Sequence, residues 1–243
     1  MPVSTASVVV PRVTGFNDGS AVQAYEGAGK GESTIAFEGT PMPMPTIASY
    51  ANASLQVLQD VTALTEFLGL WLRYFVMRKL ENLVISGTGD GTDKISGLLT
   101  VGLACEPGLE HAADNILWAA ESALPNYGYS ASLIILNNID YVNMLSARTT
   151  FKGYQGPGWA SGINTTLWGI PVVPSVGCPQ GRAAVLDGNL VAILDRLEMA
   201  LMIGYVGNQF SSNECTLLAE TRSNIAIMDP NAVQGLTIQT TSG

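Results

Sequence analysis

The stretch DVTALTEFLGLWLRYFVMRKLENLVISG, residues 60–87, carries the strongest periodic pattern in the chain. Asp60 is a suitable N-cap and Gly87 a suitable terminator, so the stretch predicts one helix. Apolar residues recur on it at helical spacing, at Leu64, Leu68, Trp71 and Phe75, with Leu72, Val76, Leu80 and Leu83 beside them. The helix would hold roughly 25 residues and measure about 37 Å, which suits an elongated spine. We expect its Trp and Met side chains to belong to the core.

Two strand-like runs precede this helix, SVVVPR at 7–12 and STIAFE at 33–38. They flank about 20 residues rich in Gly, Asn, Asp and small side chains, a pattern that predicts a long hairpin arm with a flexible tip. Because an isolated hairpin is marginally stable in water, we expect the arm to lie on something, such as a neighbouring subunit. The prolines of PMPMPT, residues 41–46, then predict an extended connector.

The part of the chain after the helix reads as an α/β or α+β globule. A Gly/Asp-rich turn at 87–99 marks a boundary, and shorter elements alternate beyond it. We predict helices at 113–124 and 138–147, strands at 131–137 and 168–175, and a glycine-rich loop at 151–162. Two further strands, 198–207 and 213–229, are too long for a small globule, so we expect them to return along the spine as a ladder.

Composition excludes several classes of protein. The 243 residues are 47% hydrophobic and only 13% charged, which indicates extensive burial against other subunits. A net charge of −9 argues against a protein that wraps nucleic acid by neutralising phosphates. Residues 67–77, the most hydrophobic window, are too few to cross a membrane, and no signal peptide is readable. The three cysteines, Cys105, Cys178 and Cys215, are expected to be buried free thiols in a reducing compartment.

The sequence offers few candidates for catalytic or metal-binding motifs, and none is complete. In AYEGAGKGESTIAF, residues 24–37, Lys30 lies between glycines, but Ala24 and Gly31 occupy positions that a phosphate-binding loop requires as Gly and Ser or Thr. Lys30 is then a solvated lysine at a loop tip. The single histidine, His111, is expected at the surface or at a helix cap, and it cannot support a His-rich metal site. We therefore predict no enzyme activity, no cofactor and no metal.

The order of these parts resembles the major capsid proteins of tailed bacteriophages, the Hong Kong 97 fold that encapsulin shells share. Seven stretches carry the likeness: AYEGAGKGESTIAF (24–37), QVLQDVTALTEFLGLWLRYFV (56–76), ISGTGDGTDKISGL (85–98), YSASLIILNNIDYVNML (129–145), LWGIPVVPS (167–175), VLDGNLVAILDR (185–196) and NECTLLAETRSNIAIMDPNAV (213–233).

The resemblance implies an α+β fold of several parts. They are a remnant N-terminal arm (1–10), an E-loop hairpin (11–41), a P-domain (42–97 and 196–222, with a spine helix at about 60–86) and an axial A-domain (98–195 and 223–243). The family usually carries a longer arm before the hairpin, so we expect either a processed chain or assembly through other contacts.

The resemblance also gives Lys30 a second interpretation. In cross-linking members of the family, an E-loop lysine forms an isopeptide bond with an asparagine of a neighbouring P-domain, assisted by a glutamate. The matching positions here are Lys30, Asn213 and Glu220. Asn213 and Glu220 lie seven residues apart, about 23 Å along a strand. The two side chains of one chain therefore cannot take part in the same isopeptide bond. A site built from several subunits and a plain E-loop lysine both stay open.

The function that the resemblance implies is structural. The chain would be a coat subunit that forms hexamers and pentamers of an icosahedral phage head around double-stranded DNA, without sequence-specific contact to it. Its partners would be itself, a portal and decoration or scaffolding proteins, with no membrane, in the virion capsid and, during assembly, in the host cytoplasm. The alternative is an encapsulin-type shell around an enzyme cargo.

Overall fold

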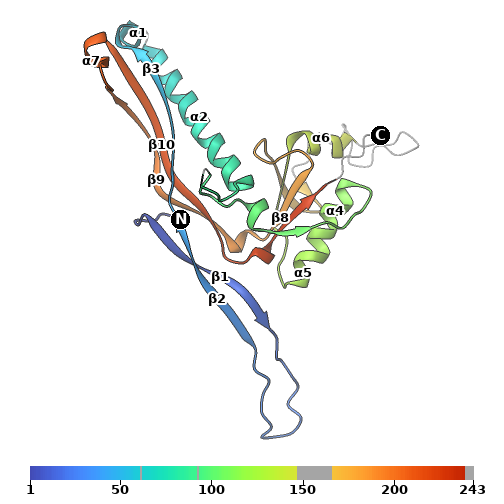
Figure 1. Cartoon of the computed structure of the whole chain (residues 1–243). Helices are drawn as coiled ribbons and strands as arrows, with labels where there is room; N and C mark the ends of the chain where they lie inside the picture. The colour runs from blue at the N-terminus through green and yellow to red at the C-terminus, as the bar shows by residue number, and fades with distance from the viewer. Residues whose placement is uncertain (61, 92, 147–165, 239–243) are drawn as a thin grey trace.

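The computed structural model describes residues 1–60, 62–91, 93–146 and 166–238. Figure 1 shows a long body of strands and one long helix, a lobe of helices and strands beside it, and a hairpin that projects away from both. This arrangement is the α+β fold that the sequence predicts, with an extended hairpin and a long helix. The predicted loop at 151–162 lies outside the described residues.

The projecting hairpin consists of β1 (Ser7–Asn17) and β2 (Thr34–Pro43), which pair antiparallel. The predicted arm is thus confirmed. Pro41 opposes Val9 and Pro43 opposes Ser7, so the proline-rich connector begins within the second strand of the arm. It stays extended into the next strand, as expected.

The body is built on a three-stranded sheet of order β3-β10-β9, with α2 packed on one face. Its strands are β3 (Thr46–Ser54), β9 (Val191–Gly204) and β10 (Glu214–Ile227), and its helices are α1 (Leu55–Asp60), α2 (Thr62–Ser86) and α7 (Gln209–Ser212). Both long strands lie along the helix, which confirms the predicted ladder. Its register shifts near Arg222, which opposes Leu197 while Ser223 opposes Asp195.

The long helix is confirmed, but the face it buries is not the one first identified. Leu72, Val76 and Leu80 pack against the sheet and are at most 9% exposed. Trp71 and Met77 are 45% and 54% exposed, so the prediction that they belong to the core is wrong. The cause is that the helix is apolar nearly all round, and spacing alone does not say which stripe meets the sheet. Asp60, the predicted N-cap, is the last residue of α1.

The lobe holds a mixed six-stranded sheet of order β4-β11-β8-β5-β7-β6. Its strands are β4 (Leu103–Cys105), β5 (Leu133–Leu136), β6 (Thr166–Leu167), β7 (Ile170–Pro174), β8 (Arg182–Leu186) and β11 (Val233–Thr237). Its helical elements are α3 (Leu98–Val101), α4 (Ala112–Trp118), a π turn (Ala119–Ala123), α5 (Leu124–Asn126), α6 (Asn138–Ser146) and two 3-10 turns, Gly188–Leu190 and Pro230–Ala232. The predicted helices and strands of this region are confirmed within a few residues, whereas β4, β8 and β11 were not predicted.

Candidate assembly site

Lys30 lies in the tip of the hairpin, between the end of β1 and the start of β2, and its side chain is exposed. Sparse polar contacts hold this tip. Asp18 accepts a hydrogen bond from the Ser20 amide at 2.8 Å, and Gln23 donates to the Ala28 carbonyl at 2.8 Å. The bonds from Ser20, and a further one from Ser33, lower the pKa of Asp18 below its usual value. Because Lys30 is exposed to solvent in the described chain, an apolar surrounding for its amine would have to come from another copy.

Asn213 lies at the opposite end of the molecule, where α7 turns into β10 (Figure 1). It adopts a left-handed conformation with φ 55° and ψ 40°, which caps α7. Its carbonyl accepts a hydrogen bond from the Leu55 amide at 2.8 Å and so fixes the corner to the start of α1. The side chain is exposed at the outer tip of the body.

Glu220 lies on the face of the sheet that α2 does not cover. Its neighbours Leu217 and Ala219 are fully buried beneath the helix, and alternation along β10 turns Leu218 and Glu220 the other way. Glu220 opposes Ala48 of β3 and Ala200 of β9, which leaves its carboxylate half-buried between small side chains.

An apolar row crosses all three strands beside Glu220. Leu218 is paired directly with Tyr50 on one side and Met202 on the other, and these two are 69% and 44% exposed. We call Tyr50, Leu218, Met202 and Glu220 the open sheet face. An exposed apolar row next to a carboxylate is typical of a surface that another chain covers.

The structure does not bring Lys30, Asn213 and Glu220 together within one chain. Lys30 is in the tip of the hairpin, Asn213 caps α7 just before β10, and Glu220 lies within β10. Any bond between them would need more than one copy of the chain.

The base of the hairpin is fixed by residues that the sequence did not single out. Arg222 donates to the Met44 carbonyl, and Asn224 donates to the Pro43 carbonyl at 2.6 Å. Val10, Met42 and Met44 pack into a small core of their own beneath β9 and β10. The interruption of the apolar run of β10 by Arg222, Ser223 and Asn224 was the available signal, because polar residues inside a buried strand need partners.

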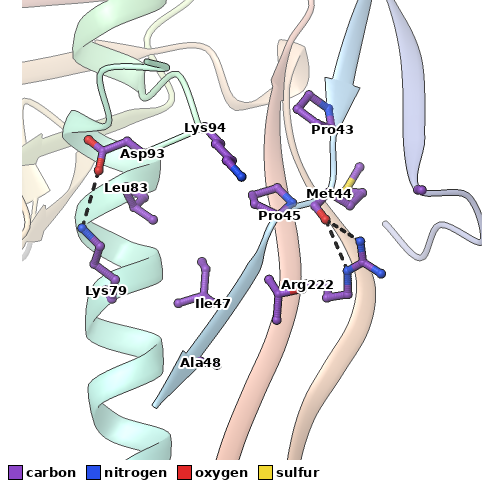
Figure 2. A pocket seen from close by; sticks show the side chains of 12 residues that line it. Pro43, Met44, Pro45, Ile47, Ala48, Lys79, Leu83, Asp93, Lys94 and Arg222 are labelled. Atoms are coloured by element: carbon purple, nitrogen blue, oxygen red, sulfur yellow. Dashed lines mark hydrogen bonds and ion pairs between the residues drawn. The ribbon is translucent and has the colours of Figure 1, made fainter. Parts of the chain in front are cut away.

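A cationic groove of about 690 Å³ lies beside this base (Figure 2). Lys79 on α2, Lys94 on the following turn and Arg222 on β10 surround Pro45 and Ile47. Lys79 pairs with Asp93 at 3.6 Å. Three cations against one acid make this groove a basic spot in a chain of net charge −9.

Predictions on the remaining candidate residues can be compared with the structure directly. His111 is exposed and occupies the N-cap position of α4, as expected, although its side chain makes no capping bond. Cys105, Cys178 and Cys215 are buried free thiols, also as expected. Within the described ranges, no cluster of His, Cys, Asp and Glu could hold a metal. Among the same residues, no helix has the length and apolarity needed to cross a bilayer.

Comparisons with known proteins agree with this architecture. The model of the phage capsid family matches residues 1–238. The major capsid protein of Enterobacteria phage HK97 is 29% identical over 213 residues, covering 86% of this chain and 55% of that protein. The chain therefore spans about half the length of this curated relative.

Solved structures show the same fold at low identity. A chain of Gordonia phage Cozz superposes with a TM-score of 0.75 at 16% identity, covering 98% of this chain and 84% of the other. A chain of Mycobacterium phage Adephagia gives 0.76 at 13% identity, covering 100% and 88%. The capsid of an empty GTA particle gives 0.73 at 18% identity, covering 98% and 86%. With the projecting hairpin, the long helix and the family match over nearly its whole length, the chain belongs to the phage capsid family.

Proposed function

We propose that this chain is the coat subunit of a tailed-phage head, assembling into hexamers and pentamers of an icosahedral shell around double-stranded DNA. The portal and scaffolding or decoration proteins would be its further partners, in the host cytoplasm during assembly and in the virion afterwards. A building role without substrate turnover follows from this proposal. The acidic balance of the chain fits a wall to which packed DNA does not adhere.

The observation that carries the proposal is the incompleteness of a single copy. The hairpin projects away from its own body, and the open sheet face and the outward side of α2 both expose large apolar side chains. Burying such surfaces is favourable by roughly 25 cal/mol per Å². Contacts between unlike surfaces, such as a hairpin on a neighbour's sheet, close into rings of five or six.

We also propose the domain division that the family resemblance implies: an N-terminal arm (1–10), an E-loop (11–41), a P-domain (42–97 and 196–222) and an A-domain (98–195 and 223–243). The three separate sheets follow this division in outline, although β1 begins within the arm and β9 and β10 both cross between the P-domain and the A-domain. The boundaries at 195–196 and 222–223 fall where the register of the β9–β10 ladder shifts.

The cross-link remains a proposal in the same framework. The Lys30 amine of one copy would attack the side-chain carbonyl carbon of Asn213 in a second copy. A new N–C bond forms, the bond to the amide nitrogen breaks, and ammonia leaves. Glu220 of a neighbouring copy would take the proton from the amine and return it to the departing nitrogen. The open sheet face would exclude water around this carboxylate once a hairpin tip covers it.

Electron microscopy of the expressed full chain tests the function. Closed icosahedral particles are expected, and co-expression with a packaging system should yield particles with nuclease-protected DNA. The encapsulin-type shell is the second candidate, because it shares the fold. Particles that capture a cargo protein and exclude DNA would favour it, and a monodisperse monomer at every concentration would contradict both.

A further inference from the structure

We draw no further inference here: the strongest candidate, the exposed aromatic surface of α2 formed by Phe67, Trp71, Tyr74 and Phe75, is an unpartnered apolar face, and nothing in the described part of the structure shows what covers it.

Discussion

The guanidinium of Arg222 donates to the carbonyl oxygen of Met44 twice, from Nη2 at 2.9 Å and from Nε at 3.3 Å. This contact joins β10 to the short segment between β2 and β3, where the hairpin leaves the body. The buried amide of Asn224 makes the adjacent bond to the Pro43 carbonyl. The direction of the hairpin is therefore set by side chains of the central strand.

Removing this contact should loosen the base of the hairpin. Arg222→Ala should lower the free energy of unfolding by about 1–3 kcal/mol, because the Met44 carbonyl, in a residue only 2% exposed, loses its charged donor. Urea denaturation measures the loss, and hydrogen exchange of the amides of residues 42–46 locates it. Arg222→Lys should be intermediate, since it keeps the charge but not the fork of donors. Equal stability of all three proteins would contradict the assignment.

Substitutions at two adjacent positions of α2 should have different effects, one on folding stability and the other on association. Leu72 is 3% exposed and Trp71 is 45% exposed. Leu72→Ala should destabilise the fold by about 2–5 kcal/mol through the cavity it leaves. Trp71→Ala should change the stability of the dissociated chain far less but weaken association. Denaturant unfolding in dilute solution separates the two effects, and a larger loss of stability for Trp71→Ala would show that the buried stripe is misassigned.

The proposed cross-link has a direct readout. Mature particles on a denaturing gel should show a ladder of linked chains, and Lys30→Ala or Glu220→Gln should collapse it to one band near 25.6 kDa. Lys94→Ala, which removes another exposed lysine, should leave the ladder intact. Should mature particles of the unmodified chain already run as one band, no such bond forms.

Alkaline pH should weaken the lobe through Tyr129. Burial, together with the hydrogen bond and charge of Asp229, raises the pKa of Tyr129 from 10.0 to about 12. Between these values the unfolded chain releases the proton while the folded chain keeps it, so this contribution to stability is complete below pH 10 and is lost as pH rises toward 12.

Tyr129→Phe isolates this effect. At neutral pH the variant should be less stable, because the fully buried Asp229 loses the hydroxyl that donates to it at 2.5 Å. The stability difference between the unmodified chain and the variant should shrink from pH 10 to pH 12. Chemical denaturation across this range measures it, and a constant difference would show that Tyr129 does not titrate in that window.

Much of the fold was predictable because a long run of apolar residues at regular spacing indicates whether the segment is a helix or a strand. The 25 residues of α2 and the long strand β10 follow from apolar spacing and length alone, whereas β9 was predicted at 198–207 and in fact spans Val191–Gly204. The buried face of α2 did not follow, because Trp71 and Phe75 recur at the same spacing as Leu72 and Val76. Which stripe is buried depends on the sheet, and two of its three strands, β9 and β10, lie more than a hundred residues away in sequence.

The short strands of the lobe, and the bonds of Arg222 and Asn224 to the base of the hairpin, could not be predicted from the sequence for other reasons. β8 and β11 hold five residues each, with small side chains such as Ala183, Ala184 and Gly235. They pair with each other, and their outer neighbours are β5 for β8 and β4 for β11, so their place depends on the whole sheet. Arg222 and Asn224 donate to backbone carbonyls, and a backbone carbonyl is present in every residue, so the sequence does not show which one is bound. Lys30, Asn213 and Glu220 came from family resemblance, and no single-chain geometry relates them.

β10 contributes to two surfaces of the chain. One half of the strand carries Leu218 and Glu220 on the open sheet face, and the other half holds the hairpin base through Arg222 and Asn224. The hairpin base and the open sheet face are therefore joined by one continuous strand, and the register of the β9–β10 ladder shifts at Arg222, between the two. In a closed shell, mechanical load on one subunit would spread along this strand to the next subunit.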